Sequence, residues 1–171
     1  MTANEKITEA ERWLAKIKNS EHRKDRTELK DNVSAFLNCA NSIPDHLLEE
    51  YNQKFNLGIT SNDKLYPNTF EKAAKTQNNT KATKFISEFN KEKKKVESDH
   101  IGKVLSKKRD LDTHRESQRP NKLVAIVGGV PAGKKNFLVN FQELSGDIDD
   151  NCERFLDLMK KFIAYMKNQF P

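Results

Sequence analysis

Apolar side chains recur every three or four residues through the first third of the chain, a spacing typical of amphipathic α-helices. One stripe runs through residues 4–19, and a second begins at residue 29. Pro44 interrupts the second stripe, which resumes at Leu47, so we expect one long kinked helix or two abutting helices. The apolar positions are Ile7, Ala10, Trp13, Leu14 and Ile17 in the first stripe, and Leu29, Val33, Phe36, Leu37, Ala40 and Ile43 in the second.

The same periodicity predicts further helices after a loop at residues 58–69, which is rich in turn residues. A short helical turn is expected around residues 70–74. A longer helix should begin near Asn79, and Ser98 or Asp99 can cap the next one, whose stripe runs on to Lys108 or Arg109. Pro120 limits how far that helix extends. The last helix should start within residues 147–150, with apolar positions at Cys152, Phe155, Leu156, Met159, Phe162, Ile163 and Met166.

The periodicity changes between residues 122 and 142. Two short apolar runs of β-forming residues, 123–127 and 137–141, flank a segment with Gly and Pro in turn positions. This arrangement predicts a β-hairpin. The expected fold is therefore a single mainly α domain over residues 1–171, a bundle of four or five helices with one small β-hairpin before the C-terminal helix.

The turn of that hairpin, residues 128–134, also matches the phosphate-binding pattern G-x-x-x-x-G-K. Lys135 stands where a phosphate-binding loop has the Mg²⁺-binding Ser or Thr. The residues that follow read as a strand, whereas a phosphate-binding loop opens a helix. We therefore favour a hairpin turn over a nucleotide-binding loop.

Composition narrows the class of protein. No apolar run approaches the roughly 20 residues that span a bilayer, and the first residues lack the apolar core of a secretory signal. The two cysteines, Cys39 and Cys152, are far apart and read as buried thiols of a reducing cytoplasm. His22, His46 and His100 show no metal-ligand spacing, so neither a metal nor a cofactor is expected.

The formal net charge of +6 is concentrated in one stretch. Residues 81–122 hold 13 Lys/Arg and 7 Asp/Glu, while the rest of the chain holds 18 of each. A local positive field attracts polyanions such as RNA or nucleotides. For residues 91–95 alone, a solvated helix face is the better interpretation.

Within this stretch, Arg109 and His114 form an Arg-x4-His pattern late in a predicted helix. Asp110 and His114 stand at i and i+4, so the carboxylate can hold one imidazole nitrogen. Histidine suits acid–base chemistry near neutral pH, and arginine presents a permanently charged fork to phosphate oxygens. These groups are the parts that RNA cleavage without a metal requires. A competing interpretation is a surface arginine and a helix-terminal histidine that interacts with the last carbonyls.

At this motif the chain resembles the HEPN superfamily, whose members are helical bundles with an Arg-x4-6-His motif near the end of a late helix. The polar residue after the arginine, Asp110, fits the pattern. The resemblance implies a homodimer whose two motifs face a shared cleft, metal-independent endoribonuclease activity, and a role in toxin or defence systems beside an antitoxin-type partner protein. Inactive members serve as nucleotide-binding or protein-interaction modules, which is the alternative function. The expected hairpin departs from the simplest bundle of the family.

The sequence thus assigns His114 as general base or acid, Arg109 as phosphate clamp and Asp110 as the group that orients His114. Four nearby cations would bind flanking phosphates of RNA, although a charged loop is an equal alternative. These are Lys108, Arg115, Arg119 and Lys122.

Overall fold

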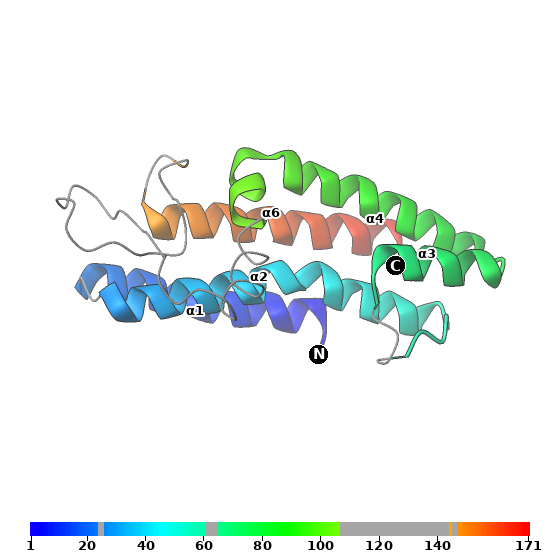
Figure 1. Cartoon of the computed structure of the whole chain (residues 1–171), viewed down its shortest axis with the longest axis horizontal. Helices are drawn as coiled ribbons and strands as arrows, with labels where there is room; N and C mark the ends of the chain where they lie inside the picture. Colours follow the sequence, from blue (N-terminus) through cyan, green and yellow to red (C-terminus); the bar gives the residue numbers. More distant parts are fainter. Residues whose placement is uncertain (24–25, 61–64, 107–143, 145–146) are drawn as a thin grey trace, which may run out of the picture.

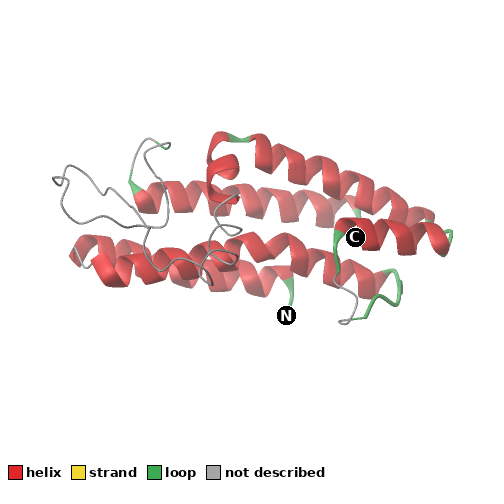
Figure 2. Cartoon of the chain, viewed as in Figure 1, coloured by secondary structure: helices red, strands yellow, loops and turns green. Residues whose placement is uncertain are grey.

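The computed structural model describes residues 1–23, 26–60, 65–106, 144 and 147–171. Five helices carry most of this part, and a further short helix occupies residues 100–106. Figure 2 shows only helices and loops among the described residues. The helices are α1 (Ala3–Arg23), α2 (Arg26–Lys54), α3 (Pro67–Thr76), α4 (Thr80–Ser98) and α6 (Ile148–Gln169).

The helices form an elongated bundle (Figure 1). α1 and α2 run side by side in opposite directions, and α6 packs on both. α4 lies on α6, and α3 contacts α4 and α2. The mainly α bundle predicted from the apolar periodicity is confirmed. The β-hairpin expected at residues 122–142 lies outside the described residues.

α2 is one helix that continues through Pro44. A proline inside a helix lacks the N–H that would bond to the carbonyl four residues earlier, here Ala40. The free-energy cost of this missing hydrogen bond is offset by packing, because Ile43, Leu47 and Leu48 around the proline are fully buried. One helix through the proline was one of the two outcomes predicted for this segment, and the predicted kink stays a prediction.

The helix starts follow local sequence signals. The Asn79 side chain accepts a hydrogen bond from the backbone N–H of Ala82 at 3.0 Å and so caps α4, which begins where the sequence predicted a helix to start. α6 begins at Ile148 with two acidic residues in its first turn, which suits the helix dipole. α3 is longer than the predicted turn at residues 70–74, because Pro67 sits in its first turn, where a missing N–H costs nothing.

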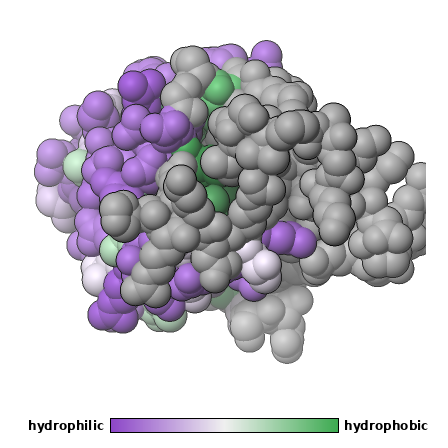
Figure 3. Space-filling view, turned by 90° about the vertical axis from the view of Figure 1, so that its left-hand side faces the viewer, coloured by the Kyte–Doolittle hydropathy of each residue, from purple (hydrophilic) through white to green (hydrophobic). Residues whose placement is uncertain are grey.

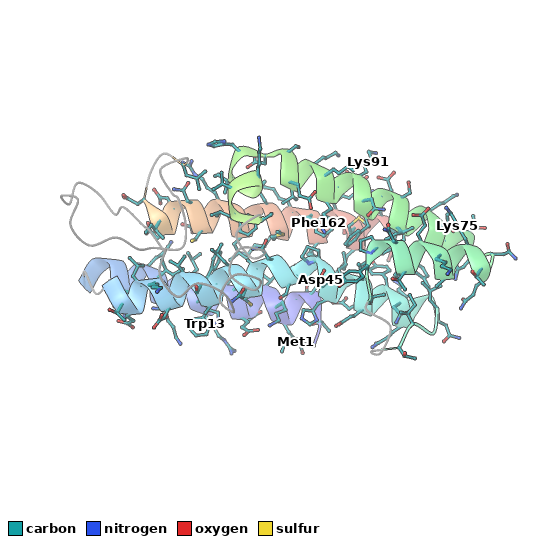
Figure 4. The ribbon with its side chains drawn as sticks, viewed as in Figure 1. Met1, Trp13, Asp45, Lys75, Lys91 and Phe162 are labelled. Carbon is teal, nitrogen blue, oxygen red and sulfur yellow. The ribbon has the colours of Figure 1, made fainter. Side chains whose placement is uncertain are left out.

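An aromatic cluster joins α2, α3, α4 and α6 at one end of the bundle. Phe85 is at its centre, with its ring stacked on Tyr51 at a centroid distance of 4.1 Å and tilted against Phe70 at 5.4 Å. Phe89 continues the cluster to Phe162 with an edge-to-face contact at 5.4 Å. Figure 4 labels Phe162 in the interior, in contrast to Lys91 on the outer side of α4. This packing fixes which face of α4 points outward.

The described surface is strongly hydrophilic. Figure 3, a view onto one end of the bundle, shows polar residues with a narrow hydrophobic strip beside atoms that are not described. Met1 and Tyr66 are the large hydrophobic residues exposed in the described part of the chain. Within that part, none of the helices has the length and apolar character needed to cross a membrane.

Candidate functional site

The helix at residues 100–106 leads the chain from α4 toward the predicted site. Asp99 caps it, because its Oδ1 accepts hydrogen bonds from the N–H groups of Ile101 at 2.9 Å and Gly102 at 3.3 Å. This confirms one of the two caps predicted from the sequence. Leu105 is fully buried, and its carbonyl accepts a hydrogen bond from the Asn41 side-chain amide of α2 at 3.2 Å. The helix is therefore tied to the bundle on its apolar side.

Gly102 allows this helix to fold closely back on the end of α4. A Cβ at this position would overlap the backbone carbonyl oxygen of Val96. A residue without a side chain is thus required where the two helices meet. The described chain continues four residues further, to Ser106, three residues before Arg109.

The residues that the sequence assigns to catalysis and phosphate binding follow Ser106 and all lie outside the described residues. The same holds for the phosphate-loop-like segment at residues 128–134. The assigned residues are Lys108, Arg109, Asp110, His114, Arg115, Arg119 and Lys122.

A cavity of about 150 Å³ lies where Ser106 meets α2, α4 and α6. Its floor is apolar and consists of Val96, Met159 and Phe162, all buried, together with Pro44. Its polar lining comes from Asn41, Asp45, Lys93, Glu97 and Ser106. Pockets that hold drug-sized ligands measure about 300–1,000 Å³, so this cavity has room for one small ring and not for a whole nucleotide.

The charged pair at the rim of this cavity is weakly held. Lys93 Nζ and Glu97 Oε1 are 3.8 Å apart, and both side chains are more than one-third exposed. An exposed ion pair at this distance is worth little and is readily exchanged for contacts with a ligand. The rim therefore offers one cation and one carboxylate to a bound molecule. Sequence reasoning missed these residues, because four separate segments contribute them and no motif links them.

The outer face of α4 carries a group of exposed lysine and serine side chains. Lys84, Lys91 and Lys94 are exposed there, and Ser87 and Ser98 lie between and beyond them. A shallow hollow on this face is lined by Ser87, Asn90, Lys91, Lys94, Lys95 and Ser98. All of these side chains can donate hydrogen bonds, and none is a carboxylate.

Neither cysteine exposes its thiol to solvent. Both are free and buried, in agreement with the sequence-based interpretation. Burial, and to a smaller extent the nearby Glu9 carboxylate, raises the pKa of the Cys39 thiol to about 11. Its Sγ donates to the carbonyl of Lys6 at 3.4 Å. Because the thiolate is the nucleophile, a thiol with this pKa is inert near neutral pH.

The described residues hold no cluster of three or more His, Cys, Asp or Glu side chains able to bind a metal. His46 lies on the surface of α2, where its Nδ1 is 2.8 Å from Glu49 Oε2. This contact between neighbouring turns is a surface interaction.

Comparisons of the chain with known protein families, with curated proteins and with solved structures found no match.

Proposed function

We propose that the protein is a metal-independent endoribonuclease of HEPN type whose centre is Arg109, Asp110 and His114. The observation that carries the proposal is the Arg-x4-His motif within residues 81–122, the stretch that holds all the excess positive charge. The helical bundle is the architecture that the resemblance implies, and the helix that the sequence predicts to carry the motif is described over residues 100–106.

The reaction is attack of the RNA 2′-oxygen on the adjacent phosphorus. His114 of one protomer takes the 2′-OH proton, and the His114 of its partner protonates the departing 5′-oxygen. The new bond joins the 2′-oxygen to phosphorus and the bond to the 5′-oxygen breaks, which leaves a 2′,3′-cyclic phosphate and a 5′-hydroxyl. The Arg109 guanidinium neutralises the charge that develops on the phosphate oxygens. Asp110 orients the imidazole.

One protomer supplies one imidazole and one guanidinium, so the proposal requires a homodimer with the two motifs in one cleft. Lys108, Arg115, Arg119 and Lys122 would bind neighbouring phosphates of the same RNA. The toxin or defence role and the antitoxin-type partner belong to this proposal through the HEPN resemblance. The cytoplasmic location belongs to it through the two free cysteines.

Cleavage of a fluorescent RNA by the purified protein in excess EDTA tests the function. We expect cleavage that His114→Ala abolishes while the helical circular dichroism spectrum and the thermal midpoint stay unchanged. His46→Ala is the matched control, because it removes an imidazole from the surface of α2. Equal cleavage by wild type and His114→Ala would overturn the assignment.

A non-catalytic nucleotide-binding module is the second candidate, and the cavity beside Ser106 favours it. Its apolar floor fits a base, and the weakly paired Lys93 and Glu97 at its rim can bind polar edges of that base. Isothermal titration with nucleoside monophosphates separates the candidates. Binding that Val96→Trp abolishes, in a protein that cuts no RNA, supports the module; RNA turnover excludes it.

A further inference from the structure

The outer face of α4 is a continuous row of hydrogen-bond donors. We call Lys84, Ser87, Lys91, Lys94 and Ser98 the α4 lysine face. Successive members are three or four residues apart, and residues at these intervals lie on one side of a helix. The row runs over 15 residues, from Lys84 to Ser98, which is about 21 Å at the rise of an α-helix.

The carboxylates of α4 leave this face positive. Its three glutamates pair with lysines of the same helix: Glu92 Oε1 with Lys95 Nζ at 2.6 Å, Glu88 Oε2 with Lys91 Nζ at 3.3 Å, and Glu97 Oε1 with Lys93 Nζ at 3.8 Å. Lys84 and Lys94 form no ion pair with any residue that the structure describes. Two ammonium groups without a described ion-pair partner, and a third paired at 3.3 Å, therefore face solvent together.

The opposite side of α4 is packed in the core. The helix therefore cannot rotate to bury these lysines or to expose its apolar side chains. Phe85, Ile86 and Phe89 are buried in the core. A helix that inserts into a membrane surface exposes an apolar face beside its lysines, and α4 has none to expose. A row of cations with hydroxyl groups between them instead matches the phosphates and sugars of a nucleic-acid strand.

We propose that the α4 lysine face binds the phosphate backbone of single-stranded RNA. The inference deepens the proposed function and rests on it, since this face would hold the RNA strand that the nuclease cuts. Lys84, Lys91 and Lys94 each neutralise a phosphate, and the hydroxyl groups of Ser87 and Ser98 donate to phosphate or sugar oxygens. The contact reads no base and is therefore independent of sequence.

Binding is measured apart from cleavage with a fluorescent 2′-O-methyl RNA, which lacks the attacking 2′-OH. The test variant carries Lys84→Gln, Lys91→Gln and Lys94→Gln. The control variant carries Lys30→Gln, Lys72→Gln and Lys161→Gln. These lysines on α2, α3 and α6 also form no ion pair with a described residue, so both variants lose the same charge.

We expect the test variant to bind at least about tenfold more weakly at low salt, and its slope of log affinity against log salt to fall by about 2, since each phosphate contact on a single strand contributes about 0.7. The control variant should keep a slope close to that of wild type. Equal losses in the two variants, an unchanged test variant, or a loss of binding to vesicles with anionic lipid and not to RNA would overturn the inference.

The two proposals can fail separately. A protein that binds the uncleavable RNA through Lys84, Lys91 and Lys94 but never cuts RNA contradicts the nuclease alone. If RNA cleavage depends on His114 but RNA affinity is unchanged by the three lysine substitutions, only the proposed role of the α4 lysine face is contradicted.

Discussion

The two sides of α4 differ in what their side chains contribute: the inner side stabilises the fold, and the outer side faces solvent. The inner side carries Phe85 and Phe89, fully buried in the aromatic cluster. The outer side carries Lys84 and Lys94, exposed and without an ion pair to a described residue. Burial of a large apolar side chain contributes several kcal/mol to folding, whereas an exposed lysine contributes almost nothing. Substitutions on the two sides should therefore change different measured quantities.

The largest effect on stability is expected for Phe85→Ala. Phe85 contacts the rings of Tyr51, Phe55, Phe70, Phe89 and Phe170, so its removal leaves a cavity shared by several elements. The free energy of unfolding should fall by about 3–5 kcal/mol. Urea denaturation followed by circular dichroism measures it, with Phe85→Leu as a milder comparison. A loss below about 1 kcal/mol would contradict the central position of this ring.

A smaller loss is expected for Gly102→Ala, where the helix at residues 100–106 meets the end of α4. The new methyl group overlaps the Val96 carbonyl, and backbone must shift to make room. Strain of this kind costs about 1–3 kcal/mol. Gly58→Ala is a comparison without steric overlap, because nothing lies within 4 Å of a Cβ there. Any loss of stability in that variant comes from the φ of +68°, which disfavours a residue with a side chain. Full stability of Gly102→Ala would show that the two helices are not in close contact.

Asn79→Ala should cost about 1 kcal/mol. The substitution removes the side-chain acceptor for the N–H of Ala82 and the amide that donates to the Phe55 carbonyl at 3.3 Å. Asn79→Asp keeps the acceptor and should recover most of the loss. Thermal denaturation of the three proteins provides the comparison, and equal midpoints for Asn79→Ala and wild type would exclude a capping role.

The smallest change in stability belongs to the outer side of α4. The triple variant Lys84→Gln, Lys91→Gln, Lys94→Gln should unfold within about 0.5 kcal/mol of wild type, because it removes one exposed ion pair and no buried contact. Loss of RNA binding in this folded variant, measured by fluorescence anisotropy, would complete the contrast with Phe85→Ala. A destabilisation comparable to that of Asn79→Ala would show that these lysines belong to the fold.

Helices were predictable from the sequence where a local signal decides them. Asp99 caps the next helix as predicted, and the helix predicted to begin near Asn79 starts there, with its apolar residues from Ala82 to Phe89 buried. Pro67 misled the prediction for α3, since a proline at the start of a helix looks the same in sequence as a proline in a turn.

The cavity and the α4 lysine face could not be predicted in this way. Asn41, Val96, Ser106 and Phe162 line one cavity only because helices distant in sequence pack together. Residues 91–95 look like an ordinary solvated helix face, because the sequence alone does not show that Glu92 pairs with Lys95. Among the residues that the structure describes, this pairing leaves Lys94 without a carboxylate partner. The motif from Arg109 to His114 stays a prediction from the sequence.

The most direct test of the proposed function is end-group analysis of RNA incubated with the purified protein in EDTA. Attack by the 2′-oxygen predicts fragments that end in a 2′,3′-cyclic phosphate and begin with a 5′-hydroxyl, in amounts that fall to background for Arg109→Ala and His114→Ala. Fragments with 5′-phosphate ends, or cyclic-phosphate fragments in equal amounts from wild type and both variants, would contradict it.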